Sequence, residues 1–421
     1  MRVLLTGAHG FIGGFIATAL GDAGHTVVSA VRNPRSDNEI ACDFARDSDC
    51  AVWLPRLAGI DAVVNCAGIL RETATQRFSA IHVDAPVALF RACASARVRK
   101  IVQISALGEP EDGEFVASKH RADAALAALD LDWTVLRPGL VYSASGSYGG
   151  TSLLRALAAL PVFFLPQTGT QKLRPIAAED VGLAVVAALE ADVVSREIVQ
   201  LVGPQALSFA DYLRAWRAWF GLKPAFELHL PQALVDATVA CGEAFTAGPV
   251  CRVIANLLQR ERVGVPDANL RMTTQLALVP RSLDAALAQR PSTPGDQREA
   301  RLYTAVPALR FAFALVWIVS GLLGLGLSSA ALQSMVPNWP PLFAQLLGRA
   351  TGALDLALGA ALLCGWRVRL IETLMLVTVL GYTVGIGLFA PQHWLDPFGG
   401  LLKNLVLIAA LWLLLVQEPR E

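Results

Sequence analysis

Three glycines near the amino terminus have the spacing that binds the pyrophosphate of a dinucleotide. Gly7, Gly10 and Gly13 follow an apolar segment at 3–5 and open a helical pattern at 15–20. In such a loop the first glycine makes the turn, the second lets the backbone approach the phosphates, and the third lets the helix pack on the strand. The helix start adds unpaired N–H groups and partial positive charge. This motif therefore predicts nucleotide binding.

The choice of nucleotide depends on the end of the next predicted strand, at 26–31. NAD-binding units usually place an acidic residue there for the ribose hydroxyls, whereas this chain has Arg32. Arginine suits a 2′-phosphate, so NADP is predicted over NAD, and a solvated basic loop is the alternative. The predicted cofactor-binding residues are Thr6, Gly7, Gly10, Phe11, Ile12, Gly13, Arg32, Asp43, Ala67, Gly68, Lys119 and Pro138.

Alternating strand and helix patterns must position these residues. Strands are predicted at 3–5, 26–31, 39–44, 61–64, 101–104 and 133–136. Helical patterns such as 87–97 and 118–129 fill the gaps. This alternation predicts an α/β fold with a Rossmann-type, doubly wound parallel sheet. Asp43 would then lie at a strand end, beside the adenine.

Several motifs, in this order, resemble the short-chain dehydrogenase/reductase superfamily: TGAHGFIG, NCAG, ISALG, FVASK and LRPGLVY. The resemblance is to the extended and atypical branches, and within them to the group of the nucleotide-binding accessory subunit of mitochondrial complex I. It covers residues 1–142 and extends, through LRPIAAEDVGLAVVAAL and VPRSL, to about residue 285.

The resemblance implies catalysis by a serine, a tyrosine and a lysine four residues after the tyrosine. Ser105 and Lys119 stand at matching positions, but Phe115 occupies the place of the tyrosine. In the family the lysine lowers the tyrosine pKa, so that the tyrosine exchanges a proton as hydride moves. Phenylalanine cannot exchange a proton. Lys119 and Ser105 are therefore catalytic candidates, with Lys119 also expected to hold the nicotinamide ribose, and enzyme activity stays an open prediction.

Composition excludes several classes of protein. The chain has 421 residues, 54% of them hydrophobic and 17% charged, and a mean hydropathy of +0.49. Thirty-five basic residues balance thirty-five acidic ones, so no global field attracts nucleic acid. Seven cysteines lack metal-ligand spacing, which predicts reduced thiols on the cytosolic side and no metal site.

The hydropathy is uneven, which divides the chain into domains. Residues 1–290 are predicted to form the nucleotide-binding domain, with 143–290 as its substrate or lid region. Residues 291–306 have the Pro, Gly and charge of a linker, and 307–421 are predicted to form a membrane domain. In the lid region, 158–166 fits a substrate wall, an interfacial patch or a core segment. The aromatic stripe at 209–220 fits a core helix better than a membrane-surface helix.

Four apolar stretches predict a bundle of four transmembrane helices at about 308–328, 342–365, 370–390 and 399–416. Arginines 298, 301 and 310 precede the first stretch, and arginines 367 and 369 lie between the second and third. The loops 329–341 and 391–398 contain no Lys or Arg. The positive-inside rule therefore predicts a multi-pass protein of the cytoplasmic membrane, with both termini and the Rossmann domain in the cytoplasm.

Arg349, Asp355, Glu372 and Lys403 form the predicted polar site of this bundle. Asp355 is near mid-span, where it must pair, protonate or face a cavity, and Arg349 or Lys403 is expected to reach it. Glu372 is expected to pair with Arg310. Such residues indicate either a proton or quinone-head-group site or interhelical contacts.

The same region carries a second resemblance. ALRFAFALVWIVSGLLGL, DLALG and HWLDPFGGLLKNLVLIAAL are similar to the DoxX-like four-helix membrane family, over about 301–418. Members of that wider family are associated with membrane oxidoreductase systems.

Together these patterns predict a membrane-anchored, NADP(H)-binding oxidoreductase acting on a lipophilic substrate such as a quinone or isoprenoid. The alternative is a non-catalytic NADP(H)-binding sensor or assembly factor for a membrane redox complex. A transporter with a nucleotide sensor is a third hypothesis. Membrane lipid and either a second copy of the chain or a membrane redox complex are the expected partners.

Overall fold

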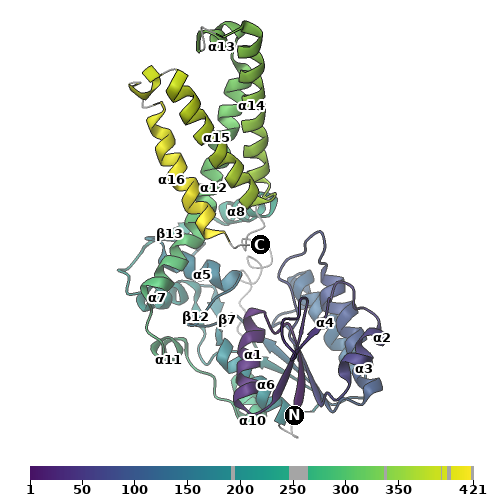
Figure 1. Cartoon of the computed structure of the whole chain (residues 1–421). Coiled ribbons are helices and arrows are strands. Elements are labelled where there is room, and N and C mark those ends of the chain that lie inside the picture. Colours follow the sequence, from purple (N-terminus) through teal and green to yellow (C-terminus); the bar gives the residue numbers. More distant parts are fainter. Residues whose placement is uncertain (191–194, 246–263, 336–338, 390, 396–399, 419–421) are drawn as a thin grey trace. The chain divides into compact units, whose positions relative to one another are not determined.

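The computed structural model describes the chain apart from residues 191–194, 246–263, 336–338, 390, 396–399 and 419–421 (Figure 1). Its internal contacts divide it into two compact units. Unit 1 comprises Met1–Ala240 and Pro249–Arg301, and unit 2 comprises Cys241–Gly248 and Leu302–Glu421. This division follows the uneven hydropathy of the sequence.

A seven-stranded sheet with parallel pairing throughout organises unit 1, as predicted. Its strand order is β11-β6-β5-β4-β1-β2-β3. The strands are β1 (Arg2–Thr6), β2 (Thr26–Val31), β3 (Glu39–Ala41), β4 (Ala62–Asn65), β5 (Lys100–Ile104), β6 (Trp133–Pro138) and β11 (Glu197–Leu201). Because β1 pairs with β2 on one side and β4 on the other, the strand order reverses at β1. Ligands of such sheets bind at the carboxyl ends of the strands beside this point.

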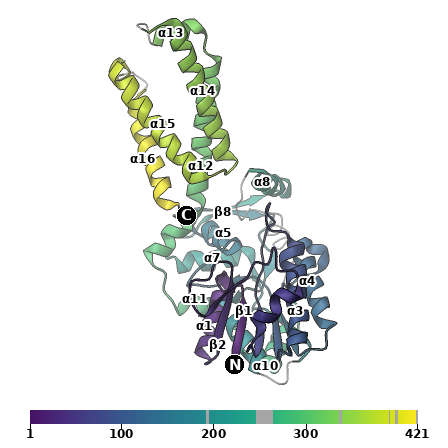
Figure 2. The same ribbon diagram turned by 45° about the vertical axis from the view of Figure 1, so that its right-hand side comes forward.

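Helices cover both faces of the sheet, which buries the central strands completely (Figures 1 and 2). One core cluster joins the sheet to α1 (Phe11–Asp22), α6 (Ala178–Glu190) and α10 (Ala268–Leu276). The other joins it to α2 (Cys50–Trp53), α3 (Ala85–Ala96) and α4 (Glu114–Ala127). Strands buried on both faces read as continuous apolar runs, which explains the sequence pattern.

The third strand is shorter than predicted, since β3 ends at Ala41 and not at Phe44. Local hydrogen bonds turn the chain after it. Asp43 Oδ1 accepts from the Ala45 amide at 3.0 Å, and Asp47 Oδ2 accepts from the Asp43 amide at 2.8 Å. Aspartate side chains that bond to nearby backbone favour turns over strands.

Part of the predicted lid region forms a smaller assembly around an aromatic core, whereas α6, β11 and α10 of the same region belong to the main sheet and the helices that cover it. Its elements are β7 (Val141–Tyr142), α5 (Gly150–Ala159), β8 (Val162–Pro166), β9 (Lys172–Leu173), β10 (Ile176–Ala177), β12 (Leu207–Ser208), α7 (Phe209–Trp219), β13 (Phe226–Leu230) and α11 (Leu283–Ala288). Helix α8 (Gln232–Phe245) follows β13 in the chain. Tyr212, Trp216 and Phe220 are fully buried, so the stripe at 209–220 is core, as favoured. In β8, Phe163 and Leu165 are buried, which makes this segment mainly core as well.

Helix α12 (Pro294–Gly326) begins inside the predicted linker, so the prediction of a linker at 291–306 is wrong from residue 294 onward. Asp296 in its first turn accepts from the Thr293 amide at 2.8 Å and the Thr293 hydroxyl at 2.7 Å. The same carboxylate lies 3.3 Å from Arg155 and 3.2 Å from Arg290. These bonds stabilise the start of α12 in a segment whose Pro and Gly content had predicted a linker.

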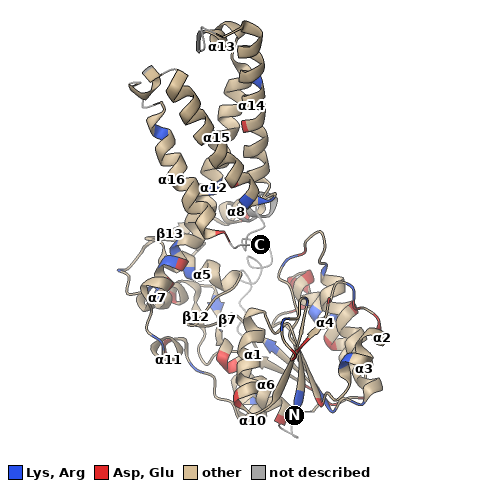
Figure 3. Cartoon of the chain, in the orientation of Figure 1, with Lys and Arg blue, Asp and Glu red and all other residues tan. Residues whose placement is uncertain are grey.

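Unit 2 is helical. Besides the rest of α12, it contains α13 (Ser329–Met335), α14 (Pro341–Leu363), α15 (Val368–Phe389) and α16 (Leu402–Gln417). Among the described residues, three helices are long and apolar enough to cross a membrane: α12, α14 and α15. The prediction of four such helices is corrected in this respect, because α16 has 16 residues against the ~20 that a full crossing needs. The predicted start of the fourth span, residue 399, lies outside the described residues. Lys and Arg are sparse along these helices (Figure 3).

Helices α12 and α14 approach at glycines. A Cβ at Gly321 would lie 2.7 Å from the Gly352 carbonyl oxygen, and one at Gly359 would lie 2.9 Å from the Ala314 carbonyl oxygen. Small residues let membrane helices pack backbone to backbone, where dispersion forces hold them together.

Candidate nucleotide-binding site

The glycine loop between β1 and α1 has the predicted geometry. Gly7 has φ of +68°, and a Cβ there would lie 2.7 Å from the Cys66 carbonyl oxygen. A Cβ at Gly13 would lie 2.0 Å from the Gly7 carbonyl oxygen, so only glycine allows α1 this close to the turn. Gly10 is the N-cap residue of α1. The first-turn N–H groups, including those of the half-buried Phe11 and Ile12, therefore point out of the helix start, where a pyrophosphate fits.

Thr6 ties the ends of β1 and β4 together. Its buried hydroxyl donates to Asn65 Oδ1 at 2.6 Å and accepts from the amides of Cys66 at 3.1 Å and Ala67 at 3.3 Å. The Thr6 side chain therefore stabilises the conformation of the 65–68 loop. Thr6 was predicted as a cofactor contact, and its observed contacts are with the protein.

Lys119 lies in α4 and reaches the same loop. Its Nζ donates to the Ala67 carbonyl at 2.9 Å and the Ile104 carbonyl at 3.2 Å. A Cβ at Gly68 would lie 3.0 Å from this Nζ, so glycine at 68 leaves room for the lysine. Burial lowers the pKa of Lys119. Three of the predicted residues, Ala67, Gly68 and Lys119, are thus adjacent beside the carboxyl ends of β4 and β5.

Ser105, the other catalytic candidate, is engaged elsewhere. Its Oγ donates to Asp123 Oδ2 at 2.7 Å, and Arg137 Nη2 lies 2.9 Å from the same oxygen. Asp123 is 3% exposed, so this network is internal. Neither Asp123 nor Arg137 was predicted as a site residue. Asp123 had one signal in the sequence, its i,i+4 spacing from Lys119, which places both on one face of α4.

Phe115 stands one turn before Lys119, where the resemblance implies a tyrosine, and its ring is part of an aromatic group. The ring centroid lies 5.7 Å from that of His82 and 6.2 Å from that of Phe78. His82 stacks on Phe78 with centroids 5.1 Å apart. The phenylalanine ring, which stands where a tyrosine is expected, thus packs as a hydrophobic side chain.

His82 was also missed, because nothing near it in sequence indicates its surroundings. It lies in the π-helical turn η2 (Ser79–Asp84), and its Nε2 accepts from the Ile69 amide at 3.0 Å. Its Nδ1, 2.8 Å from Ser118 Oγ, must then carry the proton, while that hydroxyl donates to the Phe115 carbonyl. Burial, with help from the positive charge of Lys119, lowers the pKa of His82 to about 2. The imidazole is therefore neutral and both of its nitrogens are occupied.

The remaining predicted cofactor residues lie around the same strand ends. Arg32 is exposed directly after β2, and the half-buried Asp43 bonds within its own turn. Pro138 is buried at the end of β6. Glu39 at the start of β3 accepts from His9 of the glycine loop at 2.9 Å, which places a carboxylate beside the loop.

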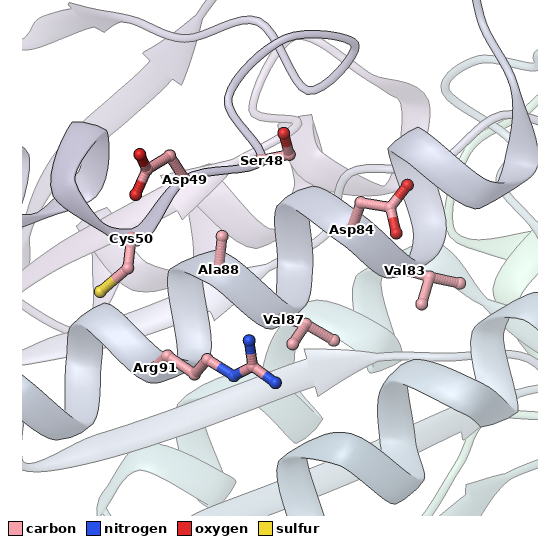
Figure 4. A pocket seen from close by; sticks show the side chains of 8 residues that line it. All are labelled: Ser48, Asp49, Cys50, Val83, Asp84, Val87, Ala88 and Arg91. Atoms are coloured by element: carbon pink, nitrogen blue, oxygen red, sulfur yellow. The ribbon is translucent and has the colours of Figure 1, made fainter.

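A pocket of about 700 Å³ lies on another part of unit 1 (Figure 4). It is lined by residues at the start of α2 and along η2 and α3, among them Asp49, Asp84 and Arg91. None of the predicted cofactor residues lines it, so it is separate from the glycine loop.

The predicted polar residues of unit 2 are arranged differently from the expectation. The Asp355 carboxyl lies 3.1 Å from Ser320 Oγ and 3.2 Å from Tyr382 Oη, while Arg349 donates to the Leu325 carbonyl at 2.6 Å. The prediction that Arg349 or Lys403 reaches Asp355 is therefore wrong. The predicted pair of Arg310 and Glu372 is present, at 2.9 Å.

Two family models match the chain. Residues 3–201 match the NAD dependent epimerase/dehydratase family, and residues 314–412 match a DoxX-like family. The first match contains the glycine loop, Ser105 and Lys119. The second contains Asp355 and its two hydroxyl partners.

Curated relatives match the amino-terminal half. The photosystem II assembly factor Ycf39 of Synechocystis sp. is 30% identical over 225 residues, which are 51% of this chain and 66% of that protein. An uncharacterized protein of Mycobacterium tuberculosis is 27% identical over 217 residues, which are 50% of this chain and 22% of that protein. The chain thus spans slightly less than two thirds of the first relative and under a quarter of the second.

Solved structures share the fold. The human epimerase family protein SDR39U1 with NADPH has a TM-score of 0.52 at 23% identity, covering 69% of this chain and 98% of its own. UDP-glucuronic acid 4-epimerase from Bacillus cereus in complex with NAD has a TM-score of 0.53 at 18% identity, covering 72% of this chain and 100% of its own. At these identities the likeness concerns the fold alone.

Proposed function

We propose that this chain, which joins an NAD dependent epimerase/dehydratase domain to a DoxX-like membrane domain, holds NAD(P)(H) as a binding module without turning it over by tyrosine–lysine chemistry. Its role is then that of a sensor or an assembly factor for a membrane redox complex. One observation carries the proposal: Phe115 occupies the tyrosine position and packs against Phe78 and His82.

The residues around Phe115 offer no substitute acid. His82 is neutral with both ring nitrogens bonded, and the Ser105 hydroxyl donates to Asp123. Two hydrogens of the Lys119 ammonium are directed to backbone carbonyls, which leaves one for a ribose hydroxyl. These groups hold and orient a nucleotide, but they do not deliver a proton to a substrate oxygen.

The glycine loop supports the nucleotide half of the proposal. A bound nicotinamide dinucleotide supplies hydride chemistry; here the chain's own residues bind it and shape its surroundings. Gly10 opens α1 toward the pyrophosphate, and Lys119 lies beside Gly68. The described assembly role of the Synechocystis relative supports the sensor or assembly hypothesis.

Two glycine variants test nucleotide binding. Gly13→Ala would place a Cβ 2.0 Å from the Gly7 carbonyl oxygen, whereas Gly14→Ala has no atom within 4 Å. Full-length protein in mild detergent is titrated with NADPH and NADH, following the fluorescence of the reduced nicotinamide. We expect Gly13→Ala to lose binding at least tenfold and Gly14→Ala to keep it. Equal affinity in both variants, or no binding by the native chain, would contradict the proposal.

The NADP preference is a separate part of the proposal. Arg32 is exposed beyond β2, where a 2′-phosphate is expected. Arg32→Asp is expected to weaken NADPH binding about tenfold or more while NADH binding changes little. Equal losses of affinity for NADPH and NADH would contradict the proposed preference for NADP.

An oxidoreductase acting on a quinone or isoprenoid is the second candidate, favoured by the membrane helices, which confine the protein where such molecules dissolve. Quinone reduction consumes one hydride from NADPH and one proton, giving NADP⁺ and the quinol. Native protein loaded with NADPH is mixed with a soluble quinone, with Lys119→Ala as the control. Nicotinamide decay that depends on Lys119 would favour this enzyme over the binding module. A stable bound signal supports the binding module.

For location, we propose the cytoplasmic membrane, with the Rossmann domain and both termini in the cytoplasm. Three arginines in the first half of α12 and two at the start of α15 support this orientation, since the opposite loops contain neither Lys nor Arg.

A further inference from the structure

We propose that Asp355 is a neutral carboxylic acid and, with the hydroxyls of Ser320 and Tyr382, forms a proton-binding site within the membrane helices. The inference concerns unit 2 alone and does not depend on the proposed nucleotide function.

Three helices converge on this carboxyl group. Asp355 comes from α14, and its Oδ2 lies 3.1 Å from Ser320 Oγ of α12. Its Oδ1 lies 3.2 Å from Tyr382 Oη of α15. The residue is 7% exposed and lies about 12 Å along the helix from Leu363, the nearer end of α14. The group is therefore inside the apolar part of the bundle.

No cation balances a charge on Asp355. Both partners are neutral hydroxyls, and in the described part of unit 2 no Lys or Arg lies within ion-pair distance of its carboxyl. Arg349, on the same helix, donates to the Leu325 carbonyl, and Lys403 is exposed on α16. On α15 the residue after Tyr382, Thr383, accepts from Asn404 of α16, so that neighbour is also neutral.

Glu372 of α15 is the contrasting case in the same unit. It is fully buried, but Arg310 of α12 lies 2.9 Å from its Oε1. Arg310 also pairs with Glu418. A buried carboxylate with an arginine keeps its charge, whereas an isolated charge in hydrocarbon is expensive. Among the described residues of unit 2, the buried Glu372 therefore has a cationic partner and the buried Asp355 does not.

A neutral acid fits the hydroxyl environment. Its O–H donates and its other oxygen accepts, and serine and tyrosine hydroxyls can each do both. The group can thus release and regain a proton without a change of partners. An amide would serve equally well as an interhelical contact but has no exchangeable acid proton, so Asp355→Asn separates the two roles.

Carbodiimide labelling tests the proposal on the full-length chain in lipid nanodiscs. Dicyclohexylcarbodiimide is apolar and reacts with protonated carboxyls: the acid oxygen bonds to the central carbon, and the acid proton moves to a nitrogen. Peptide mass spectrometry then locates the adduct. We expect Asp355 to be labelled and Glu372, the matched buried carboxyl, to remain free. Labelling of Glu372 at or above the level of Asp355 would overturn the assignment.

Infrared spectroscopy tests the same assignment without the reagent, by comparing the native chain with Asp355→Asn. The native chain should show a carboxylic-acid C=O band that shifts in D2O and is absent from Asp355→Asn. Glu372→Gln should retain this band. If the native and Asp355→Asn spectra coincide in this region, Asp355 is ionised and the proposal is wrong.

Discussion

At the scale of single residues, the most informative position is Phe115. It lies one helical turn before Lys119, whose Nζ is 2.9 Å from the Ala67 carbonyl. The resemblance places a tyrosine there, whose hydroxyl would need the lysine nearby to lower its pKa. Lys119 thus stands at the position that the resemblance implies for the lysine, although Phe115 stands at the position of the tyrosine. A nucleotide-holding role explains this, because Lys119 can bind ribose without a tyrosine.

Phe115→Tyr tests whether the rest of a reductase site is intact. The added hydroxyl restores a proton donor one turn from Lys119, and we expect slow NADPH-dependent reduction of small aldehydes that the native protein lacks. Stopped assays with full-length protein measure the alcohol product. Phe115→Tyr combined with Lys119→Ala should lose this activity. If Phe115→Tyr binds NADPH but forms no alcohol, the chain has lost its substrate site as well.

His82 makes a second prediction at this scale, for the dependence of stability on pH. Its pKa in the folded protein is lowered to about 2, below the usual value of about 6.5. Between these values the unfolded chain binds more protons, so stability is complete above about pH 6.5 and falls as the pH is lowered. The slope from this residue approaches about 1.4 kcal/mol per pH unit.

Denaturant unfolding of full-length protein between pH 4.5 and 7.5, followed by the near-ultraviolet circular dichroism of unit 1, measures this slope. His82→Gln should be less stable at neutral pH and should lose stability less steeply in acid. The exposed His229, as His229→Gln, is the control and should keep the native slope. An unchanged slope in His82→Gln would show that His82 is not neutral in the folded chain.

At the scale of elements, α12 is shared by the two units, since it begins at Pro294 in unit 1 and ends at Gly326 in unit 2. Its first turn is fixed by Asp296, whose carboxylate meets Arg155 of α5. The Arg155 guanidinium also lies over the rings of Trp216 and Trp219 of α7 and of Phe220. The start of the helix is thus held in the aromatic core of unit 1.

Asp296→Ala should therefore destabilise unit 1 strongly. Removing the carboxylate leaves Arg155, 3% exposed, without its partner, and losing one member of a buried ion pair costs about 3–5 kcal/mol. Tryptophan fluorescence during denaturant unfolding reports the change. Asp284→Ala, which removes an exposed carboxylate from the first turn of α11, should cost under about 1 kcal/mol. Equal effects would mean that the pair contributes no specific stability.

At the scale of the whole molecule, the number of membrane crossings decides on which side each terminus lies. Helices α12, α14 and α15 are long enough to cross, while α16 has 16 residues. Three crossings would separate the carboxyl terminus from the Rossmann domain, and four would return it to the same side. The arginine distribution favours four, because both the start of α12 and the α14–α15 connection are basic.

We expect a reporter fused after Glu421 to lie in the cytoplasm. A fluorescent protein fused there should fluoresce and a periplasmic phosphatase should be inactive; the same phosphatase fused in the loop 329–341 should be active. Helix α16 is about 24 Å long. A helix of this length can cross where the bilayer thins or where the side chains at the helix ends reach the interface. Phosphatase activity at the carboxyl terminus would mean three crossings.

The sequence by itself determined the features that depend on local pattern. The glycine spacing of 7, 10 and 13 determined the tight turn between β1 and α1, because turn geometry needs only neighbouring residues. Apolar runs separated by helical segments determined the parallel sheet, and apolar runs long enough to cross a membrane determined three candidate membrane helices among the described residues. The four-residue spacing of Phe115 and Lys119 placed both on one helix face.

Only the tertiary structure decided which distant residues meet. His82 and Phe115 are far apart in sequence, as are Ser105 and Asp123, and no local pattern pairs them. The same holds in the membrane domain, where Asp355 meets two hydroxyls and not the predicted Arg349. A sequence pattern gives the face on which a side chain lies, but its partners depend on how the helices pack, and that is set by the cores of the two units as a whole.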